Sequence, residues 1–196
     1  MTAVEESLGD GWVEKFHLTD LNTEKLRMAI LMFDKTVSQS AKCMLDVGGV
    51  PLTTTLVSFD DNLDMDVTVA EMTEDANDSD LKFGYSKMLE QAVEHEQPQF
   101  VIQSCEAWQA WHPDSETLPD NFRVRDQPDK KEVVVNSMFC NLYGTVLHLS
   151  CSQEVFRDKD TEKPTGVSPL DIYETHQNQE DRGMLASFVG MIPPLS

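Results

Sequence analysis

The sequence is poor in basic residues. Fifteen lysines and arginines face 35 aspartates and glutamates, giving a net charge of −20. Such a chain repels nucleic acid and anionic membranes, so neither is expected as a partner, whereas a basic protein surface would be attracted. Two interpretations stay open: a merely soluble or halotolerant protein, or an acidic decoy that occupies a nucleic-acid-binding site on another protein.

Cysteine is also scarce, and long apolar runs are missing. The four cysteines are widely and irregularly spaced, which is not typical of a disulfide framework, so we expect free thiols that behave as small apolar residues. No apolar run approaches the ~20 residues of a membrane-spanning helix. The acidic start MTAVEESLGDGW has no basic segment before an apolar block, so no signal peptide and a cytoplasmic location are expected.

Common catalytic and cofactor motifs are missing as well. The sequence contains no glycine-rich phosphate loop, no Gly-x-Ser-x-Gly elbow, no His-Glu-x-x-His and no dinucleotide fingerprint. We therefore expect no cofactor and favour a non-enzymatic protein.

The most β-prone stretch is 99–152, and the other elements are interpreted as its cover. A helix is predicted from Asn22 or Thr23 to Gly48, because apolar residues recur at three- and four-residue spacing. These residues are Leu26, Ile30, Phe33, Val37, Ala41 and Met44. A second helix is predicted from Ser79 or Asp80 to about Glu94.

Strands are predicted on either side of the second helix. Leu52–Phe59 and 65–72 form a hairpin, in which Met65, Val67 and Val69 alternate with polar residues as one half-buried strand. Phe100 opens a central strand, a long polar loop covers 113–131, and a hairpin follows with its turn at Tyr143-Gly144. The tail from Ser168 is interpreted as a possible helix start, a polar middle and an apolar finish.

These elements predict an α+β fold with about five largely antiparallel strands and two helices packed on one face. The length favours one domain over residues 1–196, with its core at about 22–152. Segments 1–21 and 153–196 are expected to be peripheral.

Three short motifs give a resemblance. They are Gly48-Gly49-Val50-Pro51 before a strand, Ser104-Cys105-Glu106-Ala107-Trp108 at a strand end, and Pro128-Asp129-Lys130-Lys131-Glu132-Val133-Val134 at a strand entry. With them, residues 22–152 resemble a family of small bacterial and phage α+β proteins that has no assigned activity. The resemblance implies the order of elements and the fold, and it makes a phage-encoded protein an expectation.

The acidic turn after the first predicted strand imitates a calcium loop. Asp60, Asn62, Asp64 and Glu71 fall at positions 1, 3, 5 and 12, but Met65 stands where the loop needs glycine. The alternative, which we favour, is the polar tip of a hairpin.

Two further clusters of residues are candidate sites. Cys105, Cys140, Cys151 and His148 lack the local pairs typical of zinc sites, and the predicted hairpin places Cys140 and Cys151 on one face and His148 on the other, near Phe139. Glu106, with Trp108, Trp111 and His112, could form an acid/base pocket. A small hydrolase or metal-dependent enzyme that uses Glu106, His112 and His148 is therefore the alternative function, and a structural or assembly subunit is a further one.

The leading hypothesis is a non-enzymatic module that binds a basic protein surface. Between Asp46 and Asp80 there are ten carboxylates and no lysine or arginine. The residues expected to steer the partner are Asp60, Asp61, Asp64, Asp66, Glu71, Glu74 and Asp75. Leu185, Phe188, Val189 and Met191 would add apolar contact, either to that partner or to a second copy in a homo-oligomer. The alternative is that this tail packs back on the sheet.

Overall fold

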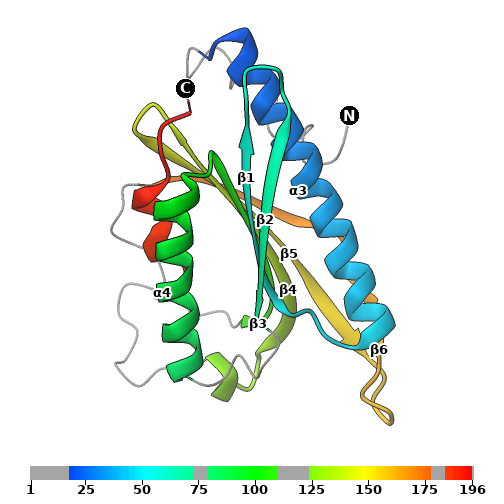
Figure 1. The fold of residues 1–196 in the computed structure, drawn as a ribbon. Helices are drawn as coiled ribbons and strands as arrows, with labels where there is room; N and C mark the ends of the chain where they lie inside the picture. The colour runs from blue at the N-terminus through cyan, green and yellow to red at the C-terminus, as the bar shows by residue number, and fades with distance from the viewer. Residues whose placement is uncertain (1–17, 73–78, 110–123, 178–183, 196) are drawn as a thin grey trace.

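A computed structural model describes residues 18–72, 79–109, 124–177 and 184–195 (Figure 1). Its strands form one seven-stranded antiparallel sheet in the order β2-β1-β3-β4-β5-β6, with β7 also paired to β5. The elements are α3 (Asp20–Val47), β1 (Leu52–Phe59), β2 (Met65–Met72), α4 (Ser79–Glu96), β3 (Phe100–Gln109), η2 (Val124–Asp126), β4 (Lys131–Leu142), β5 (Thr145–Arg157), β6 (Pro164–Val167), β7 (Asp171–Gln177) and η4 (Met184–Met191).

Helix α3 is defined by a cap at each end. The Asn22 amide donates to the Thr19 hydroxyl at 3.2 Å, so Thr19 is the N-cap and the helix begins at Asp20, two residues before the earlier of its two predicted starts. At the other end Gly48 adopts φ +90°, and its amide donates to the Met44 carbonyl at 2.9 Å. A side chain at Gly48 would strain this left-handed cap, which explains the Gly-Gly stop.

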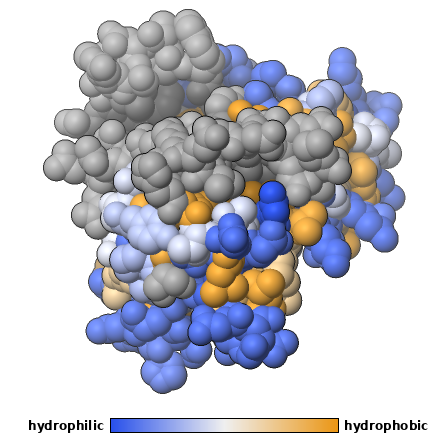
Figure 2. Space-filling model, turned by 90° about the horizontal axis from the view of Figure 1, so that it is seen from above, coloured by the Kyte–Doolittle hydropathy of each residue, from blue (hydrophilic) through white to orange (hydrophobic). Residues whose placement is uncertain are grey.

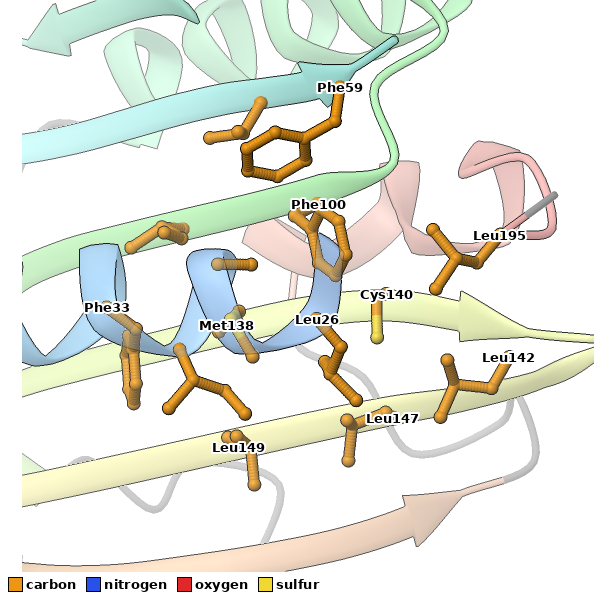
Figure 3. Close-up of a cluster of buried hydrophobic side chains, with 14 of the residues drawn as sticks. Leu26, Phe33, Phe59, Phe100, Met138, Cys140, Leu142, Leu147, Leu149 and Leu195 are labelled. Carbon is orange, nitrogen blue, oxygen red and sulfur yellow. The ribbon is translucent and has the colours of Figure 1, made fainter. Parts of the chain in front are cut away.

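One face of the sheet packs on α3. Leu26 and Phe33 of the helix point at strand residues such as Met138, Leu147 and Leu149 (Figure 3), and Ile30 belongs to the same buried cluster. Of the predicted helical stripe, only Ala41 is less than fully buried. The stripe therefore predicted the covered face of this helix correctly.

The other face packs on α4 and η4, which corrects the expectation of both helices on one face. Val101 and Phe139 belong to this second cluster, whereas their neighbours Phe100, Ile102 and Met138 belong to the α3 cluster. The two helices accordingly flank the sheet in Figure 1. The physical reason is that the central strands are apolar on both faces, as strands buried between two layers must be.

Strand β5 is long enough to pair with two other strands along one edge. Its residues 146–152 pair with β7, and residues 155–157 pair with β6. Within the described residues the sheet thus has seven strands rather than about five, and 153–177 and 184–195 contribute to the sheet and core rather than lying at the periphery. The predicted helix start near Ser168 is also wrong, because the polar sequence from Asp171 forms a strand.

The β4–β5 hairpin confirms the predicted turn and the division of its faces. Tyr143 and Gly144 have φ +52° and +96°, as a tight two-residue hairpin turn requires. Cys140 and Cys151 are buried in the α3-side core, where burial raises the pKa of both thiols, that of Cys151 to about 12. Such thiols stay protonated and act as apolar packing groups.

Within the described residues, no helix is both long enough and apolar enough to cross a bilayer.

Candidate functional site

The β1–β2 hairpin forms one edge of the sheet and carries the described acids of the proposed surface. The Asp60 carboxylate accepts from the Asp64 amide at 2.9 Å and from the Asn62 amide at 2.8 Å. These backbone hydrogen bonds, that from Asp64 first, lower the pKa of Asp60 and fix the turn. Asp61, Asp64, Asp66 and Glu71 are exposed. Glu74 and Asp75 lie outside the described residues.

The structure separates Glu71 from the other three residues of the calcium-like pattern, Asp60, Asn62 and Asp64, which lie together in the turn. Glu71 pairs with Thr53 near the far end of the ladder, whereas Met65 pairs with Phe59 beside the turn. Six residues of strand separate Met65 from Glu71, or about 20 Å. Across the described parts of the chain, no three acidic, histidine or cysteine side chains form a metal-binding group. Asp60 instead serves the turn, as the hairpin-tip interpretation expects.

Strand β2 is far more exposed than its alternating sequence predicts. The relative solvent exposures of Met65, Val67 and Val69 are 47%, 37% and 59%. The prediction that these side chains are buried on one face of the strand is therefore wrong. The reason is that α3 packs on β3, β4 and β6 and leaves the outermost strand uncovered. On the opposite face Ala70 and Met72 are partly buried against the α4 cluster.

The view from above shows how apolar and charged groups share the surface. In Figure 2 hydrophilic residues form the lower rim, and apolar residues lie immediately inside it. Strand β2 itself carries both kinds of side chain, because Met65, Val67 and Val69 are exposed on it and so are Asp66 and Glu71. An edge of this composition offers contact area and charge together.

A second charged cluster lies where α3 ends. The Arg157 guanidinium holds Glu132 through two hydrogen bonds, one from Nε to Oε2 at 2.6 Å and one from Nη2 to Oε1. Nη2 also donates to the Gly48 carbonyl at 3.2 Å. A cation at the C-terminal end of a helix offsets the helix dipole, so this group ties α3 to β4 and β5.

Glu106 lies beside that ion pair. Burial, and then the charge of Glu132, raise the pKa of Glu106, while the Arg157 charge and a hydrogen bond from the Val50 amide oppose the rise. In the same β3–β4 ladder, Trp108 lies opposite Glu132, and its ring centroid is 5.1 Å from the Lys130 ammonium. Glu106, Glu132 and Arg157 thus form a closely packed charged cluster at the end of the sheet.

The catalytic alternative is not assembled from the residues that the structure describes. His148 stacks on Phe139 at 4.4 Å between ring centroids, on the α4 face, whereas Glu106 lies on the α3 face. In the ladder His148 is aligned with Val101, five residues from Glu106, or about 17 Å along the strand. These two side chains therefore cannot act on the same atom. His112 and Trp111 lie outside the described residues.

We expect Glu106→Gln to raise the thermal midpoint slightly at neutral pH. Because the folded-state pKa of Glu106 is raised, its stabilising contribution is present at low pH and is lost as pH rises through the folded value. Gln removes the repulsion by Glu132 while it can still accept from Val50. Melts at several pH values test this: the gain should shrink on acidification towards ~4.3, the ordinary glutamate pKa.

Glu132→Gln is the matched control, because it weakens the pair with Arg157 and should lower the midpoint at neutral pH. A Glu106→Gln variant that is less stable than the parent at pH 7 would contradict the cause given for the raised pKa.

Two of the four apolar tail residues, Phe188 and Val189, belong to the core rather than the surface. Phe188 and Val189 are fully buried, which corrects their assignment to a contact surface, and Phe188 meets Phe139 edge-on at 6.0 Å. The Leu195 amide donates to the Asn141 carbonyl at 2.8 Å. Met191 remains 36% exposed, and the side chain of Leu185 lies outside the described part. The alternative of a tail packed back on the sheet is therefore the arrangement observed.

The sequence did not single out the Arg157–Glu132 pair or the exposed face of β2. The sequence did contain a signal for the ion pair. Arg157 ends β5, and the other side chains on the same face of that strand are mostly apolar. For the second there was none, because alternation does not reveal which strand a helix leaves uncovered.

No protein-family model, curated protein or solved structure matched the chain.

Proposed function

We propose that this chain is a non-enzymatic interaction module that binds a basic surface of another protein through the β1–β2 hairpin. The observation that carries the proposal is the composition of this edge. Four acids, Asp61, Asp64, Asp66 and Glu71, are exposed beside three uncovered apolar side chains. The acids provide attraction, and the apolar row provides area to bury on contact.

The charge of the whole chain supports the same partner class. A net charge of −20 attracts a basic protein and repels nucleic acid and anionic membranes. Attraction between exposed charges acts over about 8 Å at physiological ionic strength, so it speeds encounter and weakens as salt rises. The hairpin acids are well placed for this, since no lysine or arginine occurs between Asp46 and Asp80.

Binding is favoured over catalysis by the position of the side chains. Among the described residues, the raised pKa of Glu106 suits acid/base chemistry, but His148, one of the two histidines of the catalytic alternative, stacks on Phe139 on the other face of the sheet. The arrangement of Glu106, Glu132 and Arg157 instead accounts for how α3 is fastened.

Neutralising the hairpin acids is expected to weaken binding to oligolysine about fivefold at low salt, since each exposed charge contributes a few tenths of a kcal/mol. The variant carries Asp64→Asn, Asp66→Asn and Glu71→Gln, and it spares Asp60, which builds the turn, and Asp61, whose carboxylate is 4.0 Å from Lys25. Fluorescence anisotropy at several salt concentrations measures the affinity.

The control variant removes the same number of charges elsewhere, at the exposed residues Asp46, Glu94 and Asp129. It should bind oligolysine nearly as the parent does. Equal losses in the two variants would show that only net charge matters and would overturn the hairpin as the binding surface.

A further inference from the structure

The outer edge of β2 has a backbone pattern that can be read from a few hydrogen bonds. The Asp60 amide donates to the Asp64 carbonyl at 3.0 Å, while Val57 and Phe59 direct backbone groups to Gln99 on the β3 side. In an antiparallel ladder, hydrogen-bonded and non-hydrogen-bonded pairs alternate. Ser58–Asp66, Leu56–Thr68 and Thr54–Ala70 are therefore the bonded pairs of the β1–β2 ladder.

It follows that Met65, Val67, Val69 and Glu71 direct their N–H and C=O groups away from β1. In the described parts of the chain no strand lies beyond β2. The edge spans about 20 Å from the first to the last of these residues. Their side chains share one face, on which Met65, Val67 and Val69 are exposed.

We infer that the basic partner binds as an extended segment that adds an eighth strand to the sheet along β2. This inference rests on the proposed function and specifies its geometry. Main-chain hydrogen bonds to the outward-facing residues would supply affinity, and alternate apolar side chains would pack on the exposed valines. Lysine or arginine at the intervening positions would face Asp66 and the acids of the turn.

Charge complementarity selects this occupant over a second copy of the chain. A β2–β2 pair would bring two acidic edges together, each with Asp66, Glu71 and the acids of the turn, and these like charges would repel each other. Acids on an open edge thus oppose self-pairing, a known hazard of exposed strands, while they attract a basic strand.

The test uses the full chain and a synthetic probe, an eight-residue peptide of alternating lysine and valine that matches the length of β2. Val67→Pro removes one outward N–H and leaves the β1–β2 hydrogen bonds in place, which proline tolerates on an edge strand. Its affinity for the peptide should fall about tenfold, equivalent to 1.4 kcal/mol. Val67→Thr, which keeps the N–H and the β-branch, should change the affinity much less.

Two further measurements keep the inference falsifiable if Val67→Pro perturbs the hairpin. The same peptide with N-methylated valines should bind the parent chain at least about tenfold more weakly, since strand addition needs its main-chain donors. Amide exchange in the free chain should be slow at Asp66, Thr68 and Ala70 and fast at Met65, Val67, Val69 and Glu71. The peptide should slow the second group.

Unchanged affinity for both the Val67→Pro variant and the N-methylated peptide would overturn strand addition. The proposed function would survive that result if oligolysine binding still depended on the hairpin acids. Slow exchange of the outward amides in the free monomer would instead show that the chain covers its own edge. Protection that rises with protein concentration would identify a second copy as the occupant. Either of these last two results overturns the inference.

Discussion

Val134→Asp is expected to abolish cooperative folding. Val134 is fully buried, and it packs with Met44, Val50 and Val155 beneath the end of α3. An aspartate there would lose its hydration without gaining a cation, because the nearby Arg157 is already bound to Glu132. We expect a loss of more than about 4 kcal/mol, comparable with the total stability of many domains.

Urea denaturation followed by circular dichroism measures this effect. Val69→Asp is the matched control, since it makes the same change in a strand at a position that is 59% exposed. That control should cost less than about 1 kcal/mol. A cooperative transition of Val134→Asp at the parental midpoint would show that the assignment of β4 to the centre of the sheet is wrong.

The parts of the fold with local signals could be predicted from the sequence. The apolar stripe and the glycine stop located α3, although its N-cap is Thr19 rather than Asn22 or Thr23, and turn residues located the β1–β2 and β4–β5 hairpins. Strand bounds 52–59 and 65–72 agree with the structure. These features depend on residues close together in the sequence, so they can be predicted without knowledge of the tertiary structure.

The arrangement of layers could not be predicted in the same way. Which face a helix covers depends on contacts between distant segments, and the apolar run at Phe100-Val101-Ile102 was compatible with one or two covered faces. Strand β7 lacked an apolar alternation, so its pairing with β5 is a tertiary effect.

Polar residues in the core were equally hidden from sequence reasoning. Asn136 is buried, and its side-chain oxygen accepts from the Ser40 hydroxyl at 2.9 Å and from the Ser104 hydroxyl at 2.5 Å. Tyr85 similarly donates to Thr54 at 3.0 Å on the other face. The Asn136 oxygen and the Tyr85 hydroxyl are each paired with a residue far away in sequence, and only the folded chain reveals the match.

The charges of the candidate site could be predicted from the sequence, but its exposed apolar surface could not. The run of acids identified the hairpin, whereas the exposure of Met65, Val67 and Val69 required knowledge of where α3 crosses the sheet. The error for the tail was the opposite one, because residues predicted to be exposed are buried. Its apolar residues resembled a contact surface, but the α4 face of the sheet had a place for them in the core.

Removal of residues 182–196 is therefore expected to unfold the chain or leave it without fixed packing. The segment buries Phe188, Val189, Ile192 and Leu195 almost completely. At about 1.5–3 kcal/mol for each buried apolar side chain, the loss is roughly 6–12 kcal/mol as an upper estimate. The hydrogen bonds of Asn141 to Ile192 and Leu195 would also be lost. Typical domains are stable by only 5–15 kcal/mol.

Two point variants of the full chain calibrate that result by denaturant melts. Phe188→Ala should cost about 3–5 kcal/mol, while Met191→Ala, at a position that is 36% exposed, should cost far less. If the shortened chain melted cooperatively at the parental midpoint yet bound the basic probe more weakly, the tail would be a contact surface after all. If it unfolds as expected, the apolar area available to a partner must come from elsewhere, and the uncovered row of Met65, Val67 and Val69 on β2 supplies it.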